Sequence, residues 1–154
     1  MFKKVVTLLA AAFLLGACQP DYGPPPPAPD PQIVNSSGQC LDARQGLVAD
    51  GTPLIVFHCH GSPNQNWTYA NGQITGVGGE CVDVQGGAPV NGSPIVLFHC
   101  SGTPSQHWTA SNGQIVGIGG KCLDILDESP ADGTPVILTP CRDVAGQQWT
   151  LSSQ

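Results

Sequence analysis

The sequence predicts an all-β domain made of three repeats, and three observations support this prediction. Glycine (20 residues) and proline (15 residues) are abundant while charged residues make up only 10%, a composition that suits short strands and tight turns better than helices. Everything after Pro29 repeats with a period of 41 residues, in units 30–70, 71–111 and 112–152. Each unit also holds one pair of cysteines with the same separation of 19 positions.

Each repeat is expected to form four short strands. Turn-forming Asn-Gly and Gly-Gly pairs divide the second repeat into the segments 73–77, 81–84, 95–100 and 107–109. The run from Ile95 to Phe98 has the strongest strand signal because its residues are β-branched or aromatic. Three such repeats give about twelve strands, which can close into a threefold assembly that leaves no long strand edge exposed.

The chain begins with a predicted signal peptide, residues 1–17. Lys3 and Lys4 precede an apolar run from residue 5 to residue 15, which is too short to span a bilayer as a helix. The run ends in the segment Leu15-Gly16-Ala17-Cys18. This segment resembles the lipobox of bacterial lipoproteins, which implies that Cys18 is lipidated. The alternative is an ordinary cleaved signal peptide in which Cys18 is unmodified.

Residues 18–29 are predicted to link this lipid anchor to the domain. Six prolines lie between residues 19 and 29 and favour an extended polyproline conformation, which would hold the domain roughly 30 Å from the membrane. The residue after Cys18 is Gln19. Lipoproteins that this segment resembles, when they have no Asp at this position, usually reach the outer membrane of Gram-negative bacteria. We therefore expect a protein of the cell envelope that meets the membrane through its lipid.

The cysteine count agrees with the lipobox. Seven is an awkward number for an exported protein, and assigning Cys18 to lipid leaves six. The repeated spacing selects one pairing out of the 15 that six cysteines allow. The predicted disulfides are Cys40–Cys59, Cys81–Cys100 and Cys122–Cys141. Zinc is the rival interpretation of paired cysteines, but no Cys-x-x-Cys occurs, so no metal site is predicted.

Charge and motifs exclude several classes of function. The net charge is −6 and no basic stripe is present, so nucleic acid is not an expected partner. The sequence has no Gly-x-Ser-x-Gly, no His-Glu-x-x-His and no phosphate-binding glycine loop. We therefore expect no enzymatic activity and no cofactor, and the oligomeric state is left open.

All three repeats carry the same ordered motif: Cys-x-Asp, Gly-(Thr/Ser)-Pro, a β-rich run, a second Cys and Gln-x-Trp. With this motif in phase three times, residues 30–154 resemble the ricin B-type lectins. The resemblance implies a β-trefoil fold with one disulfide per repeat and a glycan as the ligand. The tryptophans of the three Gln-x-Trp motifs are expected to fill the core rather than contact ligand. They are Trp67, Trp108 and Trp149.

The resemblance also implies which residues bind sugar. The aspartate would accept hydrogen bonds from sugar hydroxyls, an aromatic residue two before the second cysteine would stack on the sugar, and an Asn and a Gln would complete the polar set. The first repeat has Asp42, Phe57, Asn64 and Gln65. The second has Asp83, Phe98 and Gln106, with Ser105 in place of the Asn. The third has Asp124 and Gln147, with Thr139 in place of the aromatic residue and Gly146 in place of the Asn. We therefore expect the first site to be the strongest, the second to follow, and the third to be weak.

One departure from the family affects all repeats: Ile55, Val96 and Ile137 stand where a glutamine often points into the site. Aliphatic side chains cannot replace its hydrogen bonds, which argues against strict galactose specificity. Two alternatives to a lectin therefore stay open, a trefoil that binds a partner protein and the targeting subunit of a toxin. The aspartates can also be explained as caps of nearby turns, without any ligand. His58 and His99, which precede the second cysteines, are either sugar donors or exposed residues at strand ends.

Overall fold

The computed structural model describes residues 31–152. The predicted signal peptide, Cys18 and the proline-rich linker lie outside these residues. Within residues 31–152, no helix has the length and apolar character that crossing a membrane requires.

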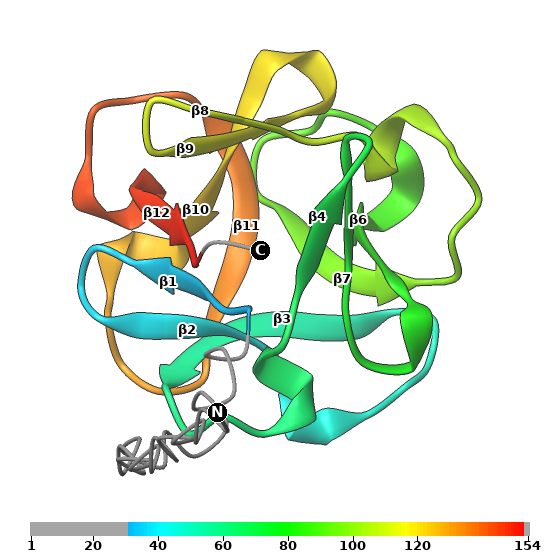
Figure 1. The fold of residues 1–154 in the computed structure, drawn as a ribbon. Coiled ribbons are helices and arrows are strands. Elements are labelled where there is room, and N and C mark those ends of the chain that lie inside the picture. Colours follow the sequence, from blue (N-terminus) through cyan, green and yellow to red (C-terminus); the bar gives the residue numbers. More distant parts are fainter. Residues whose placement is uncertain (1–30, 153–154) are drawn as a thin grey trace, which may run out of the picture.

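The described chain forms twelve strands, four in each repeat, and a single 3-10 turn lies in most of the connections between them (Figure 1). The first repeat contains β1 (Ile33–Asn35), β2 (Gln39–Ala43), β3 (Thr52–His58) and β4 (Thr68–Ala70). The second contains β5 (Gln73–Thr75), β6 (Cys81–Val84), β7 (Ser93–Phe98) and β8 (Thr109–Ser111). The third contains β9 (Gln114–Gly117), β10 (Lys121–Ile125), β11 (Thr134–Pro140) and β12 (Trp149–Leu151). The predicted all-β class and strand number are confirmed.

Three of the four strands in the second repeat have boundaries that differ from the prediction. Strand β5 ends at Thr75, two residues before the predicted end at residue 77. Strand β7 both begins and ends two residues earlier than the predicted segment 95–100. Strand β8 begins at Thr109 instead of residue 107, because the 3-10 turn Pro104–Gln106 comes first and the N–H of Trp108 donates to the carbonyl of Gly72 at 2.8 Å.

The strands close into a ring with threefold symmetry. Three ribbons, β2/β3, β6/β7 and β10/β11, are antiparallel pairs, and β3, β7 and β11 then pair with one another in a cycle. Three shorter pairs complete the fold, β4/β5, β8/β9 and β12/β1. Because β12 pairs with β1, the two ends of the described chain meet, as Figure 1 shows. The described residues 31–152 therefore contain all twelve strands of this β-trefoil.

The predicted core tryptophans are buried and bonded in the same way in every repeat. Each indole Nε1 donates to the carbonyl of the residue after the first cysteine. The acceptors are Leu41 for Trp67 (2.9 Å), Val82 for Trp108 (2.9 Å) and Leu123 for Trp149 (3.1 Å). The ring of Trp67 lies so close to Gly76 that a Cβ at this glycine would be 2.4 Å from Cζ3, and Gly117 faces Trp108 in the same way at 2.6 Å. These glycines are therefore required for the tryptophans to pack.

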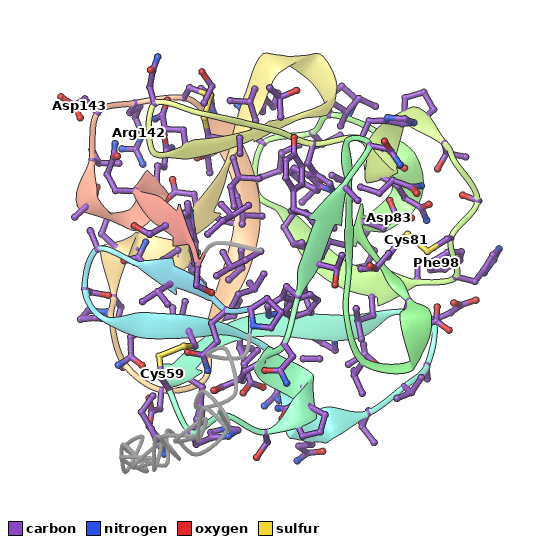
Figure 2. All side chains as sticks on the ribbon, viewed as in Figure 1. Cys59, Cys81, Asp83, Phe98, Arg142 and Asp143 are labelled. Atoms are coloured by element: carbon purple, nitrogen blue, oxygen red, sulfur yellow. A yellow bond between two sulfur atoms is a disulfide. The ribbon has the colours of Figure 1, made fainter. Side chains whose placement is uncertain are left out.

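The three predicted disulfides are present, each with a sequence separation of 19. In each bridge the first cysteine is fully buried and the second is exposed. Two of the bridges are marked in Figure 2 by Cys59 and Cys81, near the periphery of the molecule. Every bridge thus joins the start of a strand that carries an aspartate to a cysteine one or two residues beyond the end of the partner strand.

Candidate functional site

The strand register brings the same set of side chains together in each repeat. Asp42 on β2 is paired with Ile55 on β3, and two residues away Cys40 is paired with Phe57. Residues two apart in a strand point to the same face, so the aspartate, the ring and the aliphatic residue share one face of the ribbon. The second repeat repeats this register with Asp83, Val96 and Phe98, and the third with Asp124, Ile137 and Thr139.

A fully buried glutamine holds each aspartate in place with a hydrogen bond. Its Nε2 donates to the aspartate Oδ2 at 2.9 Å in all three repeats and to the carbonyl of the residue before the second cysteine at 2.9–3.0 Å. Its Oε1 accepts from the N–H of the residue after that cysteine at 2.7–2.9 Å. The glutamines are Gln65, Gln106 and Gln147, and each ends a 3-10 turn that precedes the core tryptophan by two residues. The Gln-x-Trp motif therefore links the site to the core.

In the first repeat both oxygens of the aspartate have partners. Asn64 donates to Oδ1 of Asp42 at 2.9 Å, and Nε2 of His60 lies 3.3 Å from Oδ2. The ring of His60 also meets the ring of Phe57 edge-on, with centroids 5.9 Å apart. These residues line an open pocket of about 310 Å³ with Ile55 as an apolar wall.

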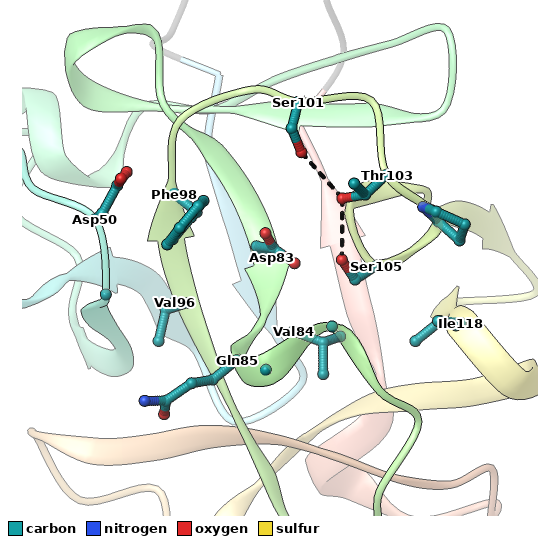
Figure 3. Close-up of a pocket in the computed structure, with 14 residues that line it drawn as sticks. Asp50, Asp83, Val84, Gln85, Val96, Phe98, Ser101, Thr103, Ser105 and Ile118 are labelled. Atoms are coloured by element: carbon teal, nitrogen blue, oxygen red, sulfur yellow. Dashed lines mark hydrogen bonds between the residues drawn. The ribbon is translucent and has the colours of Figure 1, made fainter.

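The second repeat has a larger pocket, of about 490 Å³, and its aspartate has fewer hydrogen-bond partners. Ser105 stands where the first repeat has Asn64, and its hydroxyl lies 3.2 Å from the hydroxyl of Thr103 instead of bonding the carboxylate. Oδ1 of Asp83 is consequently buried without a hydrogen-bond partner, in a residue that is only 7% exposed. Figure 3 shows Asp83 and Phe98 beside the same opening.

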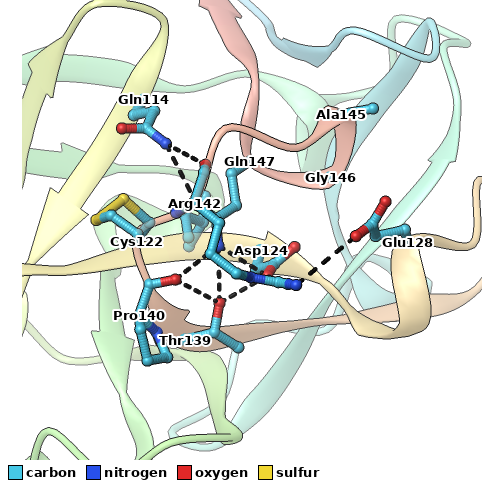
Figure 4. A network of polar contacts seen from close by, with 12 residues as sticks. Gln114, Cys122, Asp124, Glu128, Thr139, Pro140, Arg142, Ala145, Gly146 and Gln147 are labelled. Carbon is cyan, nitrogen blue, oxygen red and sulfur yellow. Dashed lines mark hydrogen bonds and ion pairs between the residues drawn. A yellow bond between two sulfur atoms is a disulfide. The ribbon is translucent and has the colours of Figure 1, made fainter.

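In the third repeat, three side chains of the protein donate hydrogen bonds to one oxygen of the aspartate. Oδ2 of Asp124 accepts from Thr139 Oγ1 at 2.6 Å and from Arg142 Nη2 at 3.1 Å, in addition to Gln147 (Figure 4). Gly146 stands at the Asn position, and a Cβ there would lie 2.7 Å from Oδ1 of Asp124. Thr139 and Gly146 therefore leave the third pocket, of about 480 Å³, without a ring or an amide, and Oδ1 of Asp124 is buried without a hydrogen-bond partner.

The family model for the ricin-type β-trefoil lectin domain matches residues 31–149. The chain belongs to this family. The designed threefold-symmetric protein ThreeFoil has a TM-score of 0.74 and 26% identity, over 80% of this chain and 98% of that one. A non-toxic homologue of type II RIPs from Momordica charantia, solved with α-methyl-D-galactoside, has a TM-score of 0.70 and 24% identity, over 79% of this chain and 46% of that one. Nigrin b of Sambucus nigra is 46% identical over 37 residues, which are 24% of this chain and 7% of nigrin b.

Two contacts at the sites of this ricin-type domain were not predicted from the sequence. His60 lies against Asp42, and Arg142 lies against Asp124. Both residues directly follow a second cysteine, a position at which the motif prescribes nothing, so only its place in the period of 41 could have drawn attention to it.

His58 and His99 are engaged with carboxylates of neighbouring repeats. Nδ1 of His58 lies 2.7 Å from Oδ2 of Asp132, and the N–H of His58 donates to Oδ1 at 2.7 Å. His99 makes the same two contacts with Asp50, at 2.9 and 2.7 Å. These ring hydrogen bonds, followed by other interactions with the same histidines, lower the pKa of both aspartates below the ordinary value of 3.8. At two of the three boundaries between repeats, a His–Asp pair on the surface of the ricin-type domain thus connects one repeat to the next.

These pairs predict how the stability of the ricin-type domain changes in acid. A carboxyl whose pKa is lower in the folded state stabilises the fold above its unfolded pKa, and this contribution is lost as the pH falls through the folded pKa. The melting temperature should therefore fall below about pH 4, and it should fall less steeply in the double variant Asp50→Asn/Asp132→Asn. Calorimetry from pH 7 to pH 2 measures both slopes. Equal slopes for the two proteins would show that the pairs contribute nothing.

Proposed function

We propose that this ricin-type lectin domain binds carbohydrate through open sites in its first and second repeats. A sugar presents hydroxyl groups that donate to carboxylate oxygens and a patch of C–H groups that packs on an aromatic ring. The first two pockets each offer a carboxylate and a phenylalanine on one face of a ribbon, with Asp42 and Phe57 in one and Asp83 and Phe98 in the other. The galactoside bound to the Momordica charantia homologue supports a glycan as the ligand.

The observation that supports this proposal most directly is the unpaired Oδ1 of Asp83 in a pocket that also holds an aromatic ring. Oδ1 of Asp124 is unpaired too, but its pocket has Thr139 in place of the ring. A buried polar atom without a hydrogen-bond partner costs about 1–3 kcal/mol, and more when it is charged. In most proteins such an atom has a partner, so an orphaned one needs an explanation. A sugar hydroxyl that enters beside Phe98 supplies the missing donor, which Asn64 supplies to Asp42 in the first repeat.

Binding is tested with residues 30–154 on a glycan array and then by titration calorimetry. The array spans galactosides and deoxy sugars, because Ile55 and Val96 present methyl groups beside the aspartates. Asp83→Ala and Phe98→Ala should each weaken the second site about tenfold or more, since each removes a charge-assisted hydrogen bond or a stacking face. Asp143→Ala, at an exposed position outside these two pockets, is the matched control and should bind as the unchanged protein does.

Two results would refute the lectin proposal. One is a folded domain that binds no printed glycan, which would favour a trefoil that binds a partner protein. The other is a set of variants, including Asp42→Ala and Phe57→Ala, that all bind as the unchanged protein does.

The proposed function is binding without hydrolysis. A glycosidase needs one carboxyl group that stays protonated near neutral pH to act as the acid. The second carboxylate lining the pocket of the second repeat is Asp50, and hydrogen bonds from His99 lower its pKa. An ionised Asp50 cannot donate a proton to a leaving group. Release of reducing sugar from a glycan that binds would contradict this part of the proposal.

The proposal also includes the place of the domain, in the cell envelope on a lipid attached to Cys18. The lipobox-like segment, the odd cysteine count and the proline-rich spacer support it. In a Gram-negative host that expresses the full chain, the protein should fractionate with the outer membrane and carry radiolabelled palmitate. Cys18→Ala should abolish the label and release the protein from the membrane. A labelled Cys18→Ala protein, or an unchanged protein found only in the soluble fraction, would exclude the anchor.

A further inference from the structure

The residue directly after the second cysteine has a fixed backbone and a variable side chain. These residues are His60, Ser101 and Arg142, which follow one another at intervals of 41. In every repeat the N–H of this residue donates to the glutamine Oε1, and Nε2 of the same glutamine donates to the aspartate. The glutamine therefore sets this residue beside the carboxylate, whatever side chain it carries.

The three side chains at this position differ in their contact with the carboxylate. The Arg142 guanidinium lies 3.1 Å from Oδ2 of Asp124, and the His60 imidazole lies 3.3 Å from Oδ2 of Asp42. The hydroxyl of Ser101 instead lies 3.0 Å from the hydroxyl of Thr103. Oδ2 of Asp83 has only Gln106 as its hydrogen-bond partner. Because Oδ1 is unpartnered in Asp124 as well as in Asp83, this position separates the repeats by what holds Oδ2.

We infer that this position decides in which repeats Oδ2 of the aspartate is free to accept a ligand hydroxyl. The inference deepens the proposed function and rests on it, because the ligand is taken to donate hydroxyls to the aspartate. Arginine is always charged and holds the carboxylate with a charge-assisted hydrogen bond that a neutral hydroxyl must displace. Imidazole offers one weaker contact, and serine offers none.

The resulting order of the sites differs from the order that the motif predicts. The second repeat, with Ser101, binds most tightly. The first binds less tightly because His60 contacts Oδ2 of Asp42, and the third binds least because Arg142 holds Oδ2 of Asp124. The pocket of the second repeat, about 490 Å³, is also larger than that of the first, about 310 Å³. The third pocket has about 480 Å³, so its expected weakness rests on Arg142 and on the missing ring and not on its volume. Counting matches to the family motif ranks the first repeat above the second, because that count ignores the residue after the cysteine.

Exchanging the side chains at this position tests the inference. In a Phe57→Ala background, which isolates the second site, Ser101→Arg should lower the affinity about tenfold, the equivalent of one hydrogen bond to a charged group. Ser101→Met, which is long but uncharged, should lower it less. In a Phe98→Ala background, which isolates the first site, His60→Ser should raise the affinity by about threefold to tenfold. Both positions are exposed, so these changes should leave the melting temperature nearly unchanged.

The probe is a panel of methyl glycosides headed by methyl α-D-galactoside, followed by calorimetry, and Ser111→Arg is the control. Ser111 is exposed on β8 and lies in none of the three pockets, so this variant adds the same charge away from Asp83 and should bind normally. If Ser101→Arg and His60→Ser bind as their backgrounds do while Asp83→Ala does not bind, the inference is overturned and the lectin function stands. If Ser101→Met weakens binding as much as Ser101→Arg, bulk rather than pairing closes the site and the inference also fails. If the unchanged protein binds no glycan, both the function and the inference fall.

Discussion

Gln106→Leu should destabilise the domain by roughly 3–5 kcal/mol and abolish binding in the second repeat. The side chain is fully buried and bonds four groups, the carboxylate of Asp83, the carbonyl of His99 and the N–H groups of Ser101 and Gly102. Leucine has a similar volume and no polar atom, so it leaves these groups without their partner in a site of low solvent access. Each unsatisfied group costs about 1–3 kcal/mol, and an ionised carboxylate costs more.

The same change in the other repeats supplies a matched comparison. Asp42 keeps Asn64 and His60 when Gln65 is replaced by leucine, and Asp124 keeps Thr139 and Arg142 when Gln147 is replaced. Asp83 has no additional side-chain partner of this kind, so Gln106→Leu should lower the free energy of unfolding the most. Urea denaturation of the three variants measures the order. Equal losses in all three would mean that the other contacts of Asp42 and Asp124 contribute no stability.

The sequence contained enough information to predict the fold class, the strand number and the disulfide pairing. The period of 41 residues aligns the cysteine pair, the Cys-x-Asp aspartate and the tryptophan of one repeat with those of the next, so a single assignment applies three times. The closed ring follows from the same symmetry, because the cross-strand contacts of β3, β7 and β11 are equivalent. Strand ends were less well predicted because competing 3-10 turns, such as Pro104–Gln106, depend on tertiary hydrogen bonds.

The site was predicted only in part, for a different physical reason. The motif identifies residues that share a face, and Asp83, Phe98 and Gln106 do come together. It does not tell which partner a carboxylate takes when several donors lie within reach. The replacement of Asn64 by Ser105 in the second repeat could be read from the sequence, but the serine hydroxyl could have turned toward Asp83 or toward Thr103. Only the coordinates show that it lies against Thr103 and that Oδ1 of Asp83 is left unpaired.

Reduction of the three disulfides should unfold the domain at temperatures where the oxidised protein is stable. Each bridge closes a loop of about 20 residues and stabilises the fold by roughly 3 kcal/mol in the chain-entropy model. Three bridges together therefore approach the 5–15 kcal/mol by which domains of this size are stable at all. Circular dichroism melts with and without a phosphine reductant should show a fall in melting temperature of about 20 °C or more.

The bridges also clamp the proposed sites, which makes a local version of this prediction possible. Asp83 lies two residues after Cys81, and Phe98 lies two residues before Cys100, so the bridge Cys81–Cys100 holds the strands that carry both residues at their common end. The double variant Cys81→Ala/Cys100→Ala should keep the fold at low temperature and lose most of the binding that belongs to the second repeat. The matching variant Cys122→Ala/Cys141→Ala should be destabilised by a similar amount and keep that binding. Equal loss of binding in both variants would mean that the bridge acts on overall stability and not on the placement of Asp83 beside Phe98.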